Sequence, residues 1–415
     1  QGAARGMDVH FIAELERHAV GIEPGLTLLL DLEVQPLQSP AHALQLLEVI
    51  TSPDQPLVRV LSMLDANTRR RDPQIAIGSS LQAVASQIDR PFAQSTSVLR
   101  PRGELEPLSQ EVNQKLIELR NYLAAIVRAP EPGLSALKAV ELRVANQHAD
   151  PVFALQQYAR NLPEPLDRWV GQIAEQSASL LLQQATASLN QEWQDKVLTP
   201  FNSQLAGRYP FDPHASKDVP LSEMERFFAP GGTLDSFYQT RLRPLLESGL
   251  FNGDSGSPLL VELHEQMAQA ERIRHTFFSP QGKLEVQFAL EPIELTANKR
   301  RSVLNLDGQL LDYAHGRRSK VPLVWPNTMR DGAESKVTLV PASGDRSPRS
   351  EGAVGPWAMF RLMDKGEVTR LSDATFDIRF PVDNGAMSYR VYTDGALNPF
   401  SGGLFSRFKL PALLY

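Results

Sequence analysis

Apolar residues at helical spacing dominate the chain from about residue 40 to residue 279. The clearest stripe alternates steps of four and three, so one face of that helix must be buried. It consists of Val112, Leu116, Leu119, Leu123 and Ile126. The same spacing recurs at Leu57, Val60, Leu61 and Leu64, and at Leu166, Trp169, Val170, Ile173, Leu180 and Leu181. These stripes predict a series of helices, each with one face in a core.

Proline-containing breaks separate the helical stretches at residues 129–133 and 162–165. Proline lacks an amide donor and has a fixed φ, so it ends one helix and permits another to begin. Short connections of this kind favour antiparallel neighbouring helices. Before residue 40 the pattern is mixed: residues 8–20 predict a helix, whereas residues 26–34 fit either a strand or a buried helix.

Beyond about Lys283 the apolar period changes to two, which is typical of strands with one buried face. The first such run contains Leu284, Val286, Phe288 and Leu290. Further strands are expected at residues 302–306, 310–314, 321–325, 336–340, 374–380, 388–392 and 405–410. Asp307-Gly308 is a good hairpin turn, and residues 357–363 predict one short helix.

Many short strands without long helices between them favour an antiparallel sandwich over a parallel sheet. We therefore expect an α+β, multidomain fold: an elongated all-helical amino-terminal part followed by an antiparallel β-sandwich. A chain of 415 residues exceeds the size of one hydrophobic core. We expect helical domains over residues 1–150 and 151–280 and the β-sandwich over residues 281–415.

Charge gives little sign of a nucleic-acid partner. The chain has 42 basic and 48 acidic residues, mixed along its length, and a net charge of -6, which argues against a phosphate-binding surface for nucleic acid. The run Lys299-Arg300-Arg301 is interpreted as a solvated strand edge that resists pairing. Because the chain has no cysteine, disulfides, thiolate metal sites and a cysteine nucleophile are excluded.

Candidate catalytic motifs are incomplete. Residues 253–258, Gly-Asp-Ser-Gly-Ser-Pro, resemble the surroundings of a trypsin-like nucleophile, but Ser255 lies between helices and no histidine base is recognisable. His264-Glu265 opens like a zinc-protease helix, yet Ala268 stands where the second histidine belongs. Phosphate loops and dinucleotide fingerprints are absent. We expect no enzyme activity, no metal and no cofactor, with a serine hydrolase using Ser255 as an alternative.

A membrane span is not expected, because the longest strongly apolar run, residues 26–32, is short and contains Asp31. The first six residues lack the apolar run of a signal peptide, and the first residue is Gln1 rather than methionine. We interpret the chain as a fragment whose membrane anchor lies upstream.

Several motifs resemble one family closely. They are Arg-Tyr-Pro-Phe-Asp-Pro at 208–213, Asp-Val at 218–219, residues 227–237, Trp-Pro at 325–326, residues 355–362 and Phe-Lys-Leu-Pro at 408–411. In this order they resemble the IcmF/TssM family of type VI secretion proteins. The likeness is strongest over residues 151–415. Its structural motif residues are Tyr209, Pro210, Phe211, Phe227, Phe228, Gly231, Gly232 and Trp357.

Local chemistry explains part of this motif. Ser222 with Glu225 forms a capping-box pattern that predicts a helix start. Pro230-Gly231-Gly232 would end that helix before helical spacing resumes at Leu234. The aromatic motif residues are expected to be core side chains that lock this corner.

The resemblance implies a periplasmic segment of an inner-membrane protein, without catalysis or cofactor. Similar proteins join the inner membrane to an outer-membrane lipoprotein, TssJ, and assemble with TssL and with further copies of themselves. The β-sandwich is the implied docking domain. Its exposed loops supply the candidate protein-binding residues, which are Trp325, Asn327, Arg330, Asn398, Phe400 and Phe405. An equivalent segment of a type IVB secretion system is an alternative.

Overall fold

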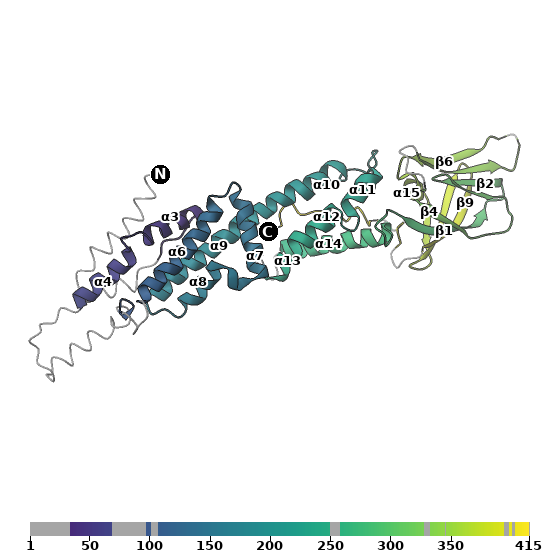
Figure 1. Ribbon diagram of the computed structural model, residues 1–415. Coiled ribbons are helices and arrows are strands. Elements are labelled where there is room, and N and C mark those ends of the chain that lie inside the picture. Colours follow the sequence, from purple (N-terminus) through teal and green to yellow (C-terminus); the bar gives the residue numbers. More distant parts are fainter. Residues whose placement is uncertain are drawn as a thin grey trace, which may run out of the picture. The chain divides into compact units, whose positions relative to one another are not determined.

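The computed structural model describes residues 34–68, 97–100, 107–249, 258–327, 333–344, 346–393, 398–400 and 403–414. By its internal contacts the chain divides into two compact units, Gln1–Leu189 and Asn190–Tyr415. Each is described by itself. In the described residues, helices make up the first unit and the start of the second, and antiparallel sheets follow (Figure 1). The predicted α+β class is confirmed.

Amphipathic helices build the first unit. Their bounds are α3 Pro40–Ile50, α4 Pro56–Thr68, α6 Leu108–Val127, α7 Pro132–Ala145, η1 Gln147–Ala149, α8 Pro151–Ala159 and α9 Leu166–Trp193, which continues into the second unit. The whole predicted stripe of α6 is buried, and α6 packs against α3 and α8. Asp150 begins α8 as an N-cap, because its Oδ1 accepts a hydrogen bond from the Val152 amide at 3.0 Å.

The helices of the second unit are short and interrupted. They are η2 Gln194–Leu198, α10 Thr199–Gln204, α11 Leu221–Phe228, α12 Thr233–Phe237, η3 Tyr238–Leu242, α13 Arg243–Glu247 and α14 Pro258–Phe277. The two π-helical turns, η2 and η3, each end two residues before a proline, Pro200 and Pro244. A proline cannot donate to the preceding turn, so the helix widens there and continues.

Two antiparallel sheets form the sandwich. Their strands are β1 Val286–Leu295, β2 Lys299–Leu306, β3 Gln309–Tyr313, β4 Val321–Trp325, β5 Glu334–Pro341, β6 Arg349–Val354, β7 Glu367–Arg370, β8 Thr375–Val382 and β9 Gly385–Thr393, with helix α15 Ala358–Met363 before β7. The strand orders are β4-β1-β9-β8-β7 and β3-β2-β5-β6. Alternate side chains meet between the sheets, where the Ser302 and Tyr389 hydroxyls lie 3.1 Å apart.

Two short connections match their predicted chemistry. Asp307 and Gly308 form the β2–β3 hairpin turn with φ of 49° and 85°, which suits an Asp-Gly pair. At the side of the sandwich the Gln309 side chain joins β3 to the edge of β4. It donates to the Val324 carbonyl at 2.7 Å and accepts from the Val324 amide at 3.0 Å. The outer edge of β4 is therefore partly closed.

The strand expected at residues 405–410 is absent. Turns and irregular backbone occupy this part of the chain. Phe405 packs on Phe277 of α14 and Phe408 packs on Phe228 of α11, so the two rings do not line one face of a strand. Strands β6 and β7 were not predicted. Neither shows the alternating burial of a half-buried strand, since both are exposed edge strands of their sheets.

The interpretation of Lys299-Arg300-Arg301 as a solvated edge is wrong. β2 pairs with β3 on one side and β5 on the other, so it is an interior strand. Lys299 is 1% exposed, and its Nζ lies 3.1 Å from Asp383 Oδ2. That hydrogen bond is the main cause that lowers the pKa of Asp383. Arg301 pairs with Asp312 on the outer face.

The capping box of Ser222 and Glu225 is also wrong. α11 begins two residues earlier than that pattern requires, after Pro220, which offers no side-chain cap. Glu225 is used elsewhere: its Oε1 accepts from the Leu284 amide at 3.3 Å, just before β1. The predicted end of the helix is confirmed, because Gly231 has a φ of 72° and α12 follows.

Three expectations fall outside the described residues: the helix at 8–20, most of the segment 26–34, and the Ser255 loop. The side chain of Leu64 is likewise not described. Within the described ranges, no helix combines the length and apolarity that crossing a bilayer requires.

Candidate functional site

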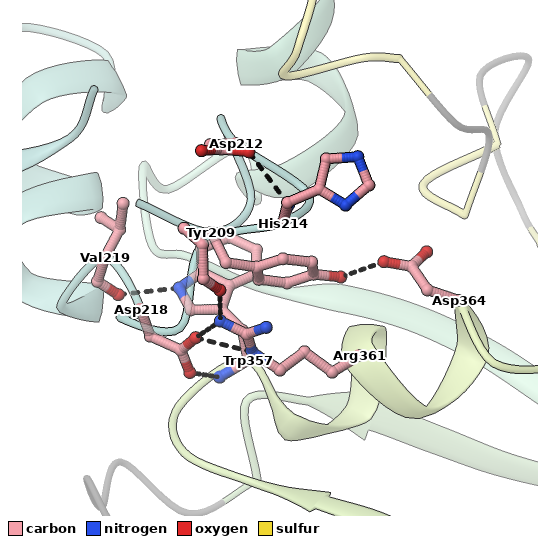
Figure 2. A network of polar contacts seen from close by, with 9 residues as sticks. Tyr209, Asp212, His214, Asp218, Val219, Trp357, Arg361 and Asp364 are labelled. Carbon is pink, nitrogen blue, oxygen red and sulfur yellow. Dashed lines mark hydrogen bonds and ion pairs between the residues drawn. The ribbon is translucent and has the colours of Figure 1, made fainter. Parts of the chain in front are cut away.

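A closed loop between α10 and α11 brings the helices of the second unit into contact with α15. The Tyr209 amide donates to the Lys217 carbonyl, and the Val219 amide donates to the Tyr209 carbonyl, each at 2.9 Å. These two bonds join the ends of the loop 209–219. Asp218 therefore has a fixed backbone from which its carboxylate reaches α15 (Figure 2).

Asp218 is the acceptor at the centre of a polar network. Arg361 of α15 donates to Asp218 Oδ1 through Nε at 2.8 Å and through Nη2 at 2.5 Å. The same Nη2 also donates to the Ala215 carbonyl at 2.8 Å. The Trp357 amide donates to the other carboxylate oxygen at 3.3 Å. Both side chains of the ion pair are largely buried, at 20% and 10% exposure, so solvent screens it less than a surface pair.

Tyr209 adds a second crossing between helices and sandwich. Its hydroxyl donates to Asp364 Oδ2 at 2.7 Å, and the Arg361 guanidinium lies 4.1 Å from its ring centroid (Figure 2). Burial, and then the hydrogen bond to the Asp364 carboxylate, raise the pKa of the Tyr209 hydroxyl. It therefore remains a neutral donor at physiological pH.

A glycine lets the two parts approach closely. Gly355 has a φ of +119°, and a Cβ at this position would lie 2.5 Å from Asp218 Oδ2. Any side chain there would displace the carboxylate that binds Arg361. Next to it, the Trp357 indole Nε1 donates to the Val219 carbonyl at 2.8 Å, which satisfies the one polar atom of a fully buried ring.

Aromatic rings from both parts fill the space behind this network. The Trp325 and Trp357 rings lie 4.7 Å apart, and Phe277 at the end of α14 lies 4.8 Å from Phe405. Phe360 of α15 meets Trp325 edge-on at 4.8 Å. Packed aromatic pairs of this kind add about 0.5–1.5 kcal/mol each to their area burial. We call the polar network and these rings the junction.

The described tail, residues 398–400 and 403–414, runs from the sandwich back along the helices. The Phe408 ring lies 5.4 Å from Phe201 and 5.1 Å from Phe228. Further along, the Trp193 indole donates to the Pro411 carbonyl at 2.9 Å. The tail thus ties sandwich and helices together a second time.

Of the predicted motif residues, Tyr209 and Trp357 belong to the junction, and Phe211 contacts its Phe405 ring at 5.3 Å. Tyr209, Phe211, Phe227, Phe228 and Trp357 are buried, as expected of core aromatics, while Pro210 and Gly232 are half-buried and Gly231 is exposed. Phe211 contributes by stacking on Phe228 at 5.8 Å. The family motif therefore consists largely of residues that pack at the junction and beside it.

The predicted protein-binding aromatics pack inside the fold. Trp325 is 1% exposed, with its indole directed to the Pro356 carbonyl at 3.3 Å, and Phe405 is 7% exposed. Phe400 is half-buried and stacks on Phe360 at 5.3 Å. In this structure all three act in packing, and partner contact remains a prediction for them.

The polar candidates lie nearer the surface. The Asn327 amide donates to Asp307 Oδ2 at 2.7 Å, and its side chain donates to the Asp307 carbonyl at 2.9 Å. Asn398 Oδ1 accepts from the Phe400 amide at 2.9 Å. Arg330 is outside the described residues. Their docking role also remains a prediction.

Sequence reasoning missed Arg361 and Asp364 as partners of the motif, and it quoted Asp218 without a role. The available signal was the Trp357-to-Leu362 run, which places Arg361 one helical turn after Trp357 on the same face. Among the residues that the structure describes, no three metal-ligating side chains gather at one point.

Comparison with known proteins agrees with this architecture. Residues 184–261 match the model of the type VI secretion protein IcmF helical domain, and residues 288–395 match that of the IcmF C2-like domain. The chain carries the carboxyl-terminal domains of the IcmF/TssM family. The junction therefore joins the IcmF helical domain to the IcmF C2-like domain.

A curated protein and solved structures are also similar to this chain. The type VI secretion system component TssM1 of Pseudomonas aeruginosa is 29% identical over 264 residues, which are 62% of this chain and 24% of TssM1. The matched part is thus about a quarter of that relative. A chain of a type VI secretion system membrane core complex superposes with a TM-score of 0.69 at 17% identity, covering 94% of this IcmF/TssM chain and 81% of that one.

A chain of a type VI membrane complex gives a TM-score of 0.66 at 16% identity, over 97% of this chain and 78% of that one. At such identities these two likenesses concern the fold.

Proposed function

We propose that the chain is a non-catalytic, structural part of a type VI secretion membrane complex. It would stand in the periplasm and link the inner-membrane anchor of its protein to the outer-membrane lipoprotein TssJ. The observation that carries this proposal is the junction, where Asp218, Arg361 and Trp357 fix the sandwich to the helices. A docking domain that is fixed to its support can transmit position and force.

The chemistry of the junction supports a mechanical role. Its buried polar groups are paired with one another: the Asp218 carboxylate with Arg361, and the Tyr209 hydroxyl with Asp364. Groups committed to such pairs stabilise one geometry and are not poised for proton transfer. Structural members of a secretion complex need this property, because a partner's position is set by the support that carries the docking domain.

The β-sandwich is proposed as the TssJ-binding part. Its loop near Asn327 is held by Asp307 of the β2–β3 turn, and Phe400 stacks on Phe360 of the junction. Recognition on loops that a rigid scaffold supports is a common arrangement in proteins. TssL and further copies of the chain are proposed as the other members of the assembly.

Binding to the cognate lipoprotein tests the proposal. The chain is mixed with the lipoprotein lacking its lipid, complex formation is measured by calorimetry, and hydrogen exchange locates the contact. The expected result is a stable complex with new protection in residues 286–393 or the tail and none in α6 or α7. Absence of a complex, or protection confined to those two helices, would contradict it.

A further inference from the structure

The end of the β-sandwich opposite α15 is made of connections that are tied together. The β1–β2 turn is the centre: Asn298 donates to the Asn384 carbonyl at 2.8 Å, and its own carbonyl accepts from the Ala342 amide at 3.0 Å. The β3–β4 loop joins through His315, whose Nε2 lies 2.7 Å from the Lys299 carbonyl. The β1–β2, β3–β4, β5–β6 and β8–β9 connections thus form one surface at this end of the sandwich (Figure 1).

Arginines dominate the exposed charge of this surface. The exposed arginines on the four connections and the strand ends next to them are Arg300, Arg317, Arg318, Arg346 and Arg349. We call them the arginine end. The acidic residues there are Asp383, which pairs with Lys299, Asp312, which pairs with Arg301, the exposed Glu294 near the end of β1 and, in the sequence, Asp345. Among the described residues, none of the five arginines makes an ion pair within 4.0 Å.

The charge of the arginine end is opposite to that of the whole chain, which is -6. An anionic surface would therefore repel most of the molecule and attract this end. This asymmetry of charge would orient the molecule at an anionic surface. The sandwich would meet the anionic surface with the four connections first.

The remaining side chains of these connections select the class of partner. Residues 342–344 are Ala-Ser-Gly, and residues 314–319 contain no large apolar side chain. Protein interfaces depend on buried aromatic or aliphatic anchors at their centre. A phosphate-bearing membrane surface requires positive charge alone, and the forked guanidinium is suited to phosphate oxygens.

We propose that the arginine end contacts the phosphate headgroups of an anionic lipid bilayer. This contact is independent of lipoprotein binding: it needs neither the lipoprotein nor the loops near Asn327. It would hold the sandwich end-on at the membrane surface. The arginines act together as a diffuse electrostatic site rather than as one pocket.

Flotation of the full chain with vesicles tests this proposal. Vesicles of phosphatidylcholine are compared with vesicles that also contain phosphatidylglycerol. We expect the chain to float with the anionic vesicles, to be released by high salt, and to stay behind with phosphatidylcholine. Each exposed basic residue near an anionic leaflet strengthens binding roughly fivefold.

The decisive variant is the triple substitution Arg317→Ser, Arg318→Ser and Arg346→Ser. Its matched control removes the same charge elsewhere, through Arg128→Ser, Arg226→Ser and Arg370→Ser, whose side chains are 67%, 65% and 74% exposed. The first variant should lose between about tenfold and about a hundredfold in vesicle affinity, and the control less than about threefold. Circular dichroism checks that both remain folded.

Three results would overturn the proposal: no flotation with anionic vesicles, equal losses in the two triple variants, or unchanged flotation of the first variant with loss of lipoprotein binding. The last result would assign the arginines to a protein surface. Because no lipoprotein is present in the vesicle assay, its failure leaves the proposed TssJ linkage standing, and failure of that linkage leaves the vesicle result standing.

Discussion

At the scale of single residues, Asp218 joins two parts of the fold that are distant in sequence. It accepts from Arg361, 143 positions further along the chain, and from the Trp357 amide. Removing one member of a largely buried ion pair leaves the other without compensation, which costs more than the pair contributes over an apolar substitute. The junction is therefore sensitive to single substitutions.

We predict that Asp218→Ala lowers the free energy of unfolding by about 2–4 kcal/mol. Asp212→Ala is the matched control, because it removes the same charge from the same loop but breaks only the local bond from the His214 amide. The control should cost less than about 1 kcal/mol. Urea unfolding followed by tryptophan fluorescence measures both. Equal losses would show that the ion pair does not hold the junction.

Asp150 gives a pH-dependent prediction in the first unit. Burial raises the pKa of its carboxyl, against the lowering by the Val152 amide and the Arg143 charge. A raised native pKa makes a contribution that is full below the unfolded pKa and is lost as pH rises through the native one. Relative to Asp150→Asn, the native chain should thus gain stability as pH falls from about 7 toward 4.

Unfolding of the native chain and Asp150→Asn in urea at several pH values measures this difference. The asparagine retains a capping oxygen for the Val152 amide, so the substitution isolates titration from capping. Asp150→Ala serves as comparison and should cost about 1 kcal/mol through loss of the cap. A stability difference that grows in the opposite direction with pH would contradict the raised pKa.

At the scale of elements, the tail behaves as part of the helical core. Phe408 is 3% exposed among Phe201, Phe211 and Phe228, whereas Leu413, five residues later, is 54% exposed. The same short segment therefore contains an anchor and a solvent-facing control. This contrast allows packing to be separated from any general effect of changing the tail.

Phe408→Ala should lower the free energy of unfolding by about 3–5 kcal/mol, because it removes a buried ring and leaves a cavity. Leu413→Ala should change it by less than about 0.5 kcal/mol. Hydrogen exchange of α10 and α11 gives a second reading, with faster exchange expected in the first variant alone. If both variants unfold like the native chain, the tail does not fix the helices.

Strong hydrophobic periodicity made most elements predictable. Elements with little burial, and residues whose partners are distant in sequence, were not predicted correctly. The alternation of β1 and the stripe of α6 follow directly from one-sided burial. The edge strands β6 and β7 bury too little to show a pattern. Lys299 appeared to be a surface charge because its partner, Asp383, is 84 positions away.

The candidate site was only half visible in the sequence. The aromatic residues of the motif, such as Tyr209 and Trp357, were predicted to be buried core side chains. Their polar partners were not predicted, because Arg361 and Asp364 are distant from the motif in sequence and contact it only in the folded chain. Trp325 is the converse case: as an aromatic beside a turn it was predicted as a docking anchor, whereas in the structure its indole is buried and directed to the Pro356 carbonyl, and its docking role remains a prediction.

At the scale of the whole molecule, the account rests on unit Asn190–Tyr415, which contains the helices of the junction and the entire sandwich. The junction and the tail provide two separate attachments within it. Domains joined by a large, buried interface move as one body, whereas domains joined by a linker alone reorient. The expected domain boundaries at residues 150 and 280 remain predictions.

A distance measurement across the junction tests the central claim most directly. Because the chain has no cysteine, Asn202→Cys on α10 and Thr369→Cys on β7, both exposed positions, would carry the only two spin labels. The account predicts one narrow distance distribution by pulsed electron resonance, broadened when Arg361→Ala is added. A broad distribution in the unaltered junction, or one that Arg361→Ala leaves unchanged, would contradict a sandwich fixed to its helices.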